Sequence, residues 1–328
     1  MPTIVLTTAR ADTPGSDPVW PWPQNDQQRA KYLEFTSRAF QEFGGDDTWF
    51  SVGFEPNLFI TEGDKTSVGE YTKTLAAVVN DKRTRGYAGK IMVPPVSTFN
   101  NNVDNTMLGI NFSFEFVQQG GATFIDAHAV DPYNPSIGGE RSAEREPEED
   151  LELFQRFVTL AGSKPLIVAE WGKPTMPGNI DSVTEARQEE VVLRGSLLFL
   201  WAGADKIAIY ELGDRDGQGF PIDPNAPQEM NFGVLRGDRS RKPLADVLDN
   251  VHRRWGAYRV VQGSKDINPD GNPNHFRVRL RKSGEPDIVV QWTGDDEEIG
   301  PRQNPQFPQR PVWGRLNGNT FTPLMPQP

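Results

Sequence analysis

Two glutamates stand where predicted β-strands end. Glu55 follows the apolar run WFSVGF at residues 49–54, and Glu170 follows PLIVA at residues 165–169. A carboxylate at the end of a buried strand is costly unless it is paired or used. The alternative for each is a strand-end residue that reaches solvent or a Lys or Arg partner. Because two such carboxylates occur in one chain, followed by Pro56 and Trp171, the pattern favours a functional pair.

Paired carboxylates suit one reaction in particular. In glycosidic bond hydrolysis, one carboxyl group protonates the leaving oxygen, and the other attacks the sugar carbon or activates water. That chemistry needs no metal. The sequence has no Cys, and its three His (128, 252 and 275) lack an HExxH-type spacing, so a zinc site is not expected. We therefore expect neither a metal nor an organic cofactor.

The elements that would position the two glutamates alternate between strand and helix as far as residue 256. This alternation predicts a parallel sheet with right-handed crossovers, in which both glutamates lie at the carboxyl-terminal edge. In a barrel of parallel strands, that edge holds the active site. The predicted strands are 3–7, 49–54, 90–96, 124–130, 165–170 and 206–212, and the predicted helices are 27–43, 67–81, 112–119, 151–160, 185–201 and 242–255.

The pattern changes after residue 257. Residues 258–261, 275–280 and 287–292 are typical of antiparallel strands joined by turns such as Ser283-Gly284. A tail from residue 299, rich in Pro and Gln, is expected to be extended and partly held by Trp313. The sequence thus predicts two domains: a barrel over 1–256, and an antiparallel β module with a Pro-rich tail over 257–328.

Composition and charge exclude several functions. With 34 Lys and Arg against 45 Asp and Glu, the net charge is −11, which disfavours nucleic acid and anionic membranes as partners. The most apolar run, 197–204, is too short to span a bilayer. The first residues, MPTIVLTTARADTPG, lack the basic and apolar regions of a secretory signal. The localisation stays open, and secretion would fit a chain whose natural N-terminus lies further upstream.

With these motifs in order, the chain resembles glycoside hydrolase clan A, the (β/α)8-barrel retaining glycosidases. In that clan, the acid/base Glu follows strand four in an Asn-Glu-Pro motif, and the nucleophile Glu ends strand seven. The resemblance covers nearly the whole chain and is carried by the order of WFSVGFEPNLF (49–59), FIDAHAVDPYNP (124–135), PLIVAEWGKP (165–174), KIAIYELGD (206–214), NFGVLRGDRSRKPLADVL (231–248) and RVRLRKSGEPDIVVQWTG (277–294). It implies that Glu170 is the nucleophile and Glu55 the acid/base in hydrolysis of β-glycosidic bonds with retention.

Further residues are expected to bind a carbohydrate substrate. His128 and Tyr133 lie in the segment similar to the strand-six region of the clan, where they would orient Glu170 or touch the sugar. Tyr210, at the end of the last predicted barrel strand, could stack on a sugar face. Trp20, Trp22 and Trp171 lie in predicted loops, and exposed indoles suit the C–H faces of sugars. For each of these residues, the alternative is a role in core packing.

Two departures from the clan keep alternatives open. Phe54 stands where the clan usually has an Asn that hydrogen-bonds the sugar 2-hydroxyl, which favours a non-catalytic carbohydrate-binding relative. The first predicted strand, 3–7, corresponds to barrel strand three, so we expect a TIM-type barrel that is incomplete, with about six parallel strands. The open edges of such a sheet invite pairing with a second copy or a partner chain. A structural relative of a glycosidase, completed by a partner, is therefore a further alternative.

Overall fold

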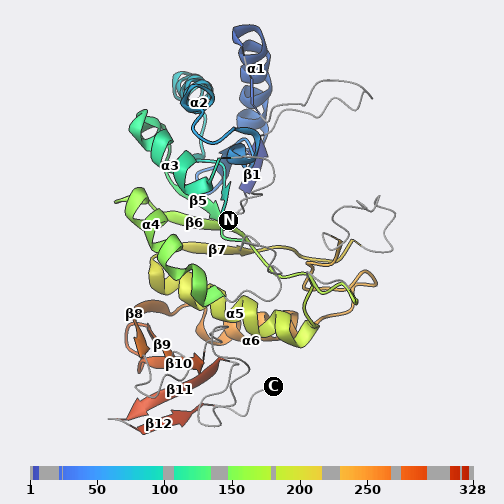
Figure 1. Cartoon of the computed structure of the whole chain (residues 1–328), viewed down its shortest axis with the longest axis vertical. Helices are drawn as coiled ribbons and strands as arrows, with labels where there is room; N and C mark the ends of the chain where they lie inside the picture. Colours follow the sequence, from blue (N-terminus) through green and yellow to red (C-terminus); the bar gives the residue numbers. More distant parts are fainter. Residues whose placement is uncertain are drawn as a thin grey trace. The chain divides into compact units, whose positions relative to one another are not determined.

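The computed structural model describes residues 3–6, 22–23, 25–98, 107–133, 147–178, 182–215, 230–266, 275–293, 311–317 and 320–324. The chain divides into two compact units. Unit 1 comprises residues 1–138 and 155–169, and unit 2 comprises residues 139–154 and 170–328. The polypeptide therefore leaves unit 1, returns to it and leaves it again. In Figure 1, the colours follow the sequence from the N-terminus in blue to the C-terminus in red.

Unit 1 is built from parallel strands connected by helices. β1, β2 and β3 form a parallel sheet in that order, with Thr3 opposite Trp49 and Ser51 opposite Met92. The elements before residue 134 are β1 (Thr3–Leu6), α1 (Asp26–Phe43), β2 (Trp49–Val52), the 3-10 helix η1 (Pro56–Phe59), α2 (Lys65–Arg85), β3 (Lys90–Met92), β4 (Val96–Ser97), α3 (Gly109–Gln118), the 3-10 helix η2 (Gly121–Phe124) and β5 (His128–Asp131).

The predicted strand 90–96 is split into β3 and β4. Pro94 and Pro95 lie between the two strands, and proline has no backbone N–H to donate to a sheet. β4 then begins a second sheet in the order β4-β5-β6-β7, where β4, β5 and β6 are parallel. A parallel bridge between Met92 and Ala127 joins β3 to the residues before β5. The strand positions thus follow one another in chain order.

The helices of unit 1 begin at residues that cap them. The side chain of Asn25 accepts a hydrogen bond from the Gln28 N–H at the start of α1, and Asp64 does the same for Thr66 and Ser67 at the start of α2. Both helices also bind the strands directly. The Tyr32 hydroxyl donates to the Leu6 carbonyl, and the Tyr71 hydroxyl donates to the Val52 carbonyl at 3.0 Å.

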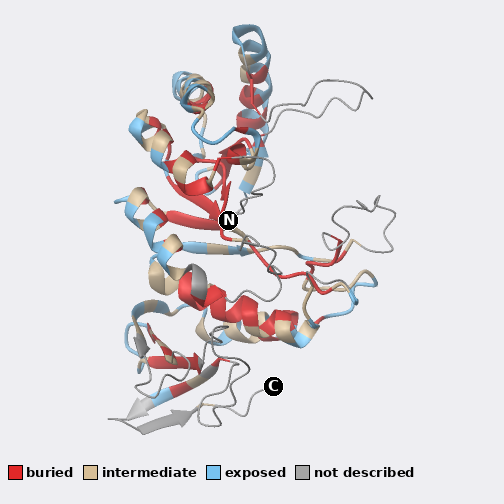
Figure 2. Ribbon diagram, in the orientation of Figure 1, coloured by how far each residue is buried: buried red, intermediate tan, exposed pale blue. Residues whose placement is uncertain are grey.

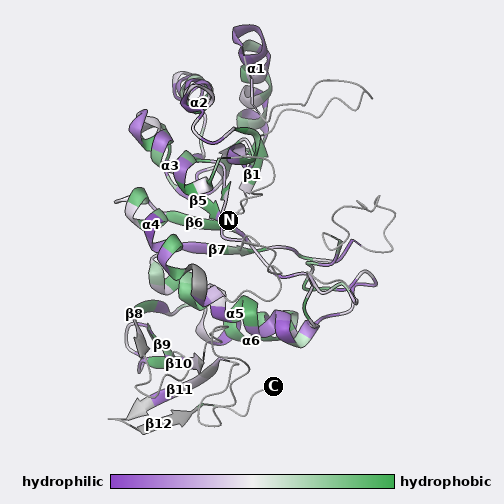
Figure 3. Ribbon diagram, in the orientation of Figure 1, coloured by the Kyte–Doolittle hydropathy of each residue, from purple (hydrophilic) through white to green (hydrophobic). Residues whose placement is uncertain are grey.

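The border between the two units falls inside one strand, between Ala169 and Glu170. That strand is largely apolar and mostly buried, and its neighbour β5 is buried throughout, as expected of parallel strands covered on both faces (Figures 2 and 3). The remaining elements of the barrel part are the 3-10 helix η3 (Pro147–Asp150), α4 (Leu151–Ala161), β6 (Leu166–Trp171), α5 (Glu185–Ala202), β7 (Lys206–Ile209) and α6 (Pro243–Trp255).

The C-terminal part is an antiparallel sheet of five strands in the order β12-β11-β10-β9-β8. The sequence predicts three of them; the other two lie in the tail, which was expected to be extended only. Trp313 of the tail stacks on Trp255 of α6 at 4.1 Å between ring centres, which confirms that it holds the tail. The five strands are β8 (Arg259–Asp266), β9 (His275–Arg281), β10 (Ile288–Thr293), β11 (Val312–Asn317) and β12 (Thr320–Pro323).

The predicted fold class is confirmed. The chain is α/β, with parallel strands at six successive positions in the described residues, as in an incomplete TIM-type barrel, and a separate antiparallel β module. The β module packs against a helix of the barrel part. Its apolar face shares a core with Leu197 and Leu198 of α5, to which β9 and β10 contribute Phe276, Val290 and Trp292. The boundary predicted at residue 256 stays a prediction.

Candidate active site

Glu55 occupies an uncommon backbone conformation just beyond β2. Its φ is 37° and its ψ is 56°, in the left-handed region that residues other than glycine rarely adopt. Gly53, two residues earlier, has a φ of 100°, and its N–H donates to the Leu6 carbonyl at 2.8 Å. Two positive φ angles separated by Phe54 turn the chain sharply at the end of the strand. The Glu55 side chain is half-buried there.

Asn57 fixes the turn that carries Glu55. This side chain is fully buried, and its amide nitrogen donates to the carbonyls of Ser97 at 3.0 Å and Met107 at 3.1 Å. Its amide oxygen accepts a hydrogen bond from the Ser97 N–H at 3.0 Å. The short helix η1 that follows Glu55 is therefore attached to β4 and to the segment before α3.

Glu170 lies inside a strand rather than after one. It is the fifth of the six residues of β6 and is half-buried, while the next residue, Trp171, is completely buried. The Trp171 indole N–H donates to the Val192 carbonyl at 3.0 Å, and its ring meets Phe199 edge-on at 5.1 Å. This packing against α5 fixes the end of the strand that carries Glu170.

A third polar group lies at the end of β7. Arg215 donates to the Glu211 carboxylate at 3.1 Å and to the Tyr210 hydroxyl at 2.8 Å, and the Tyr210–Glu211 peptide bond is cis. Burial raises the pKa of the Glu211 carboxyl above its ordinary value, although the adjacent Arg215 acts in the opposite direction. Tyr210 also packs edge-on against Phe232 at 5.4 Å.

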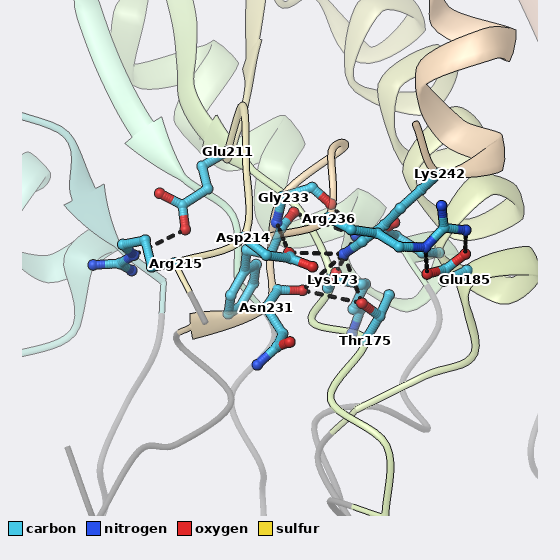
Figure 4. A network of polar contacts seen from close by, with 12 residues as sticks. Lys173, Thr175, Glu185, Glu211, Asp214, Arg215, Asn231, Gly233, Arg236 and Lys242 are labelled. Carbon is cyan, nitrogen blue, oxygen red and sulfur yellow. Dashed lines mark hydrogen bonds and ion pairs between the residues drawn. The ribbon is translucent and has the colours of Figure 1, made fainter. Parts of the chain in front are cut away.

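The loops beyond β6 and β7 are held by a buried ion pair, shown in Figure 4. The Lys242 ammonium lies 2.8 Å from Asp214 and 2.7 Å from the Thr175 hydroxyl, and both charged side chains are almost completely buried. The same Asp214 oxygen accepts the Gly233 N–H at 2.8 Å. A single lysine therefore ties the segment after β6 to the loops after β7.

Comparisons with known proteins bear on the fold. No protein-family model matches the chain, and no curated protein matches it. Among solved structures, it is similar to a family 39 glycoside hydrolase from Bacteroides cellulosilyticus WH2, with 17% identity and a TM-score of 0.57. The alignment covers 87% of this chain and 55% of that one, so the chain spans about half the length of this neighbour. Over the aligned part, the chain shares the fold of this neighbour.

Two further glycosidase-related structures align less well. A β-glucuronidase from Faecalibacterium prausnitzii has 16% identity and a TM-score of 0.46, over 68% of this chain and 34% of that one. A family 17 β-1,3-glucanosyltransferase from Rhizomucor miehei has 15% identity and a TM-score of 0.42, over 68% of this chain and 72% of that one.

Several predicted binding residues are not placed as the sequence suggested. Trp22 is 1% exposed and meets Tyr71 edge-on at 5.6 Å, and Trp171 is fully buried, so neither offers an exposed indole face. Both rings lie in the core, because burying a large apolar ring away from water stabilises the fold. Trp20 lies outside the described residues. Tyr133 is half-buried just after β5, with its carbonyl bound by the Thr98 hydroxyl.

His128 is a buried residue of β5. It lies at the start of β5, is 5% exposed and pairs in register with Leu166. Glu170 follows Leu166 by four residues along β6, which is about 13 Å at roughly 3.3 Å per residue. The structure therefore does not place His128 beside Glu170 in the register, and its contact with a sugar stays a prediction. Burial, with a smaller contribution from Lys164, lowers the pKa of His128 to about 4.

Two polar residues of this region were missed in the sequence. Asp131 is completely buried at the last position of β5, where it is a further carboxylate at the carboxyl-terminal end of a parallel strand. The strand-end pattern that pointed to the two glutamates could have identified it. Asn57 gave no signal, because its partners lie 40 and 50 residues further along the chain.

Within the described residues, no group of three or more His, Asp or Glu side chains could hold a metal ion. None of the helices in the described parts of the chain is long and apolar enough to cross a membrane.

Proposed function

We propose that the protein is a retaining glycoside hydrolase that cleaves β-glycosidic bonds in an oligo- or polysaccharide. The observation that carries the proposal is the placement of two half-buried glutamates at the carboxyl-terminal ends of β2 and β6. The resembled clan likewise carries its two catalytic glutamates at the ends of two different parallel strands. The left-handed backbone of Glu55 adds support, because such strain is concentrated at functional sites.

The proposed reaction has two displacements. Glu170 attacks the anomeric carbon while Glu55 gives a proton to the leaving oxygen, which breaks the glycosidic bond and leaves a covalent glycosyl-enzyme. Glu55, now ionised, takes a proton from water as that water attacks the same carbon and releases Glu170. The mechanism requires the two carboxyl groups to lie about 5–5.5 Å apart, against about 6.5–9.5 Å for inversion. Tyr210, Tyr133 and Trp20 are the candidates for contact with the sugar.

Two alternatives have their own support. Phe54, half-buried before Glu55, cannot hydrogen-bond a sugar hydroxyl, which favours a carbohydrate-binding relative without turnover. In the described residues, β1 is one outer strand of the first sheet and β7 is one outer strand of the second. A structural relative would pair these edges with a second copy or a partner chain. The described part of the C-terminal tail pairs with β10 instead.

The roles of the glutamates can be tested with substitutions after a screen on chromogenic β-glycosides and insoluble polysaccharides. We expect Glu170→Ala to lose turnover of every substrate, because it removes the nucleophile. Glu55→Ala is expected to spare aryl glycosides with good leaving groups and to slow the others about 100-fold or more. Added azide should then yield the β-glycosyl azide with Glu55→Ala and the α-azide with Glu170→Ala.

The control is Glu34→Ala, which removes an exposed carboxylate of α1 and should leave all rates unchanged. The opposite stereochemistry of the two azide products would mean that the roles are exchanged. A wild-type protein that binds polysaccharide without any turnover would instead support the carbohydrate-binding alternative. A protein that neither binds nor cleaves, and that is dimeric by light scattering, would support the structural one.

A further inference from the structure

The side chain of Asn57 behaves like a residue of a neighbouring strand. It both donates to the Ser97 carbonyl and accepts from the Ser97 N–H, which is how one strand residue pairs with another. Ser97 belongs to β4, whose other edge pairs with β5. The amide of Asn57 thus extends the hydrogen bonding of β4 at the place where the parallel strands are split into two sheets.

These bonds act on the backbone of Glu55. Only Pro56, whose ring fixes its own φ, separates Glu55 from Asn57. On the other side, the bond from Gly53 to Leu6 holds the chain as it leaves β2. The Glu55 carbonyl accepts the Leu58 N–H at 3.1 Å, which closes the turn. A non-glycine residue keeps a left-handed conformation only where its surroundings over-determine it, and these contacts are such surroundings.

We propose that Asn57 is the positioning residue of Glu55: by pairing with the backbone of Ser97, it holds the left-handed turn that aims the Glu55 carboxyl group. Asn57 touches no substrate, since its side chain is fully buried. For its catalytic consequence, this inference rests on the proposed function, in which Glu55 is the acid/base. The effect of Asn57 on the backbone conformation of Glu55 requires no assumption about activity.

The test uses the full chain with two substitutions and one control. N57A removes all three hydrogen bonds of the amide. N57D keeps the size and the acceptor that faces the Ser97 N–H but removes the donors to Ser97 and Met107. The control is E62Q, because the exposed Glu62 binds the Leu108 N–H and Asn111 and so joins the same loop to α3 at a distance from Glu55.

The first measurement is a crystal structure of each variant. We expect the φ of Glu55 to leave the left-handed region in N57A and N57D and to stay there in E62Q. A positive φ at Glu55 that persists in N57A or N57D overturns the proposal. If both Asn57 variants fail to fold while E62Q folds, the residue serves the fold as a whole, and the proposal is likewise overturned.

The second measurement separates positioning from a loss of folded protein. It compares kcat/KM for two glycosides of the same sugar, one with a poor leaving group that needs protonation and one with a good leaving group. We expect the ratio of kcat/KM for the poor leaving group to kcat/KM for the good one to fall at least about tenfold in N57A and N57D. The same ratio should stay constant in E62Q. A merely structural role lowers both values equally. If the wild type has no glycosidase activity, the proposed function fails, while the crystallographic measurement still decides the role of Asn57.

Discussion

The two glutamates reach the ends of their strands in different ways. Glu170 keeps a strand conformation and is fixed by the buried Trp171 beside it, whereas Glu55 stands in a left-handed turn beyond β2. Their positions were predictable, because a carboxylate after an apolar run is visible in the sequence. The conformation of Glu55 was not, since the bonds that impose it come from Asn57 and from residues distant in sequence.

The placement of His128 along its strand was not predictable for a similar reason. A histidine in a short strand looks the same at either end of it, and only the register with Leu166 decides which end it occupies. The structure places His128 at the beginning of β5, away from the edge where Glu170 lies. The three tryptophans expected to bind sugar were assigned from predicted loops, yet Trp171 belongs to a strand and Trp22 to the core.

Burial of His128 predicts a pH dependence of stability. Its pKa of about 4 in the folded protein lies below the value of roughly 6.5 expected when unfolded, so folding favours the neutral ring. The stabilisation is therefore complete above pH ~6.5 and is lost as the pH falls towards 4. In urea unfolding, we expect the free energy of unfolding to fall between pH 7 and pH 4.5 in both proteins. The fall should be smaller by about 2 kcal/mol in His128→Gln than in the wild type.

The control for this measurement is His252→Gln, on the exposed side of α6. It should lose as much stability as the wild type over the same pH range. Equal pH dependence in the wild type and His128→Gln would contradict the burial of a neutral His128.

At the scale of elements, the pattern of strand and helix was largely predictable. The six parallel strand positions appear in the expected order, because apolar runs and helical periodicity are local properties of the chain. Five of the six predicted helices are somewhat longer in the structure, and α6 is one residue shorter. The capping residues Asn25 and Asp64 explain where two of the helices begin. β11 and β12 were missed, since their pairing with the β module depends on partners such as Trp255 that lie far away in sequence.

The loops beyond β6 and β7 depend on the ion pair of Lys242 and Asp214. Lys242→Met would leave the Asp214 carboxylate buried without its ammonium partner, while the Gly233 N–H still donates to it. Removing one partner of a buried pair costs about 3–5 kcal/mol, whereas replacing both is far milder. We therefore expect urea unfolding to show a loss of that size in Lys242→Met and a recovery of at least about 1 kcal/mol in Lys242→Met/Asp214→Asn.

A surface lysine provides the comparison. Lys282 lies 3.9 Å from Glu285, and both side chains are exposed. Lys282→Met should change the free energy of unfolding by less than about 1 kcal/mol, as for other exposed pairs. A loss in Lys242→Met no larger than in Lys282→Met would show that the buried pair does not hold these loops.

For the whole molecule, the prediction of a change in architecture near residue 256 rested on the switch from alternating to purely β-type patterns. What the sequence could not reveal is how the module is joined to the rest of unit 2. The Trp292 indole N–H donates to the Glu148 carboxylate at 2.7 Å, across 144 residues of sequence. Glu148 lies 3.7 Å from Arg194 of α5, which is completely buried. One buried cluster therefore joins η3, α5 and β10.

Trp292 is thus expected to stabilise unit 2 as a whole. Trp292→Ala removes a fully buried ring that stacks on Phe276 at 5.5 Å, and should cost about 3–5 kcal/mol in urea unfolding. Trp292→Phe keeps most of the packing and loses the bond to the Glu148 carboxylate, for about 1.5–3 kcal/mol. Trp313→Phe, in a half-buried stack, serves as the control and should cost less than either. Equal costs for all three would contradict a central role for Trp292.

The shared core of α5 and the β module also has a consequence for synthesis of the chain on the ribosome. Neighbouring parallel strands are neighbours in sequence, so each can pair with the strand made just before it. Leu197 and Leu198 of α5 are different, because Phe276, Val290 and Trp292 that cover them are made roughly 80–95 residues later. Because synthesis adds about 5–20 residues per second, this apolar face of α5 stays exposed for some seconds before β9 and β10 are made. During that time, the nascent chain offers a binding site to chaperones.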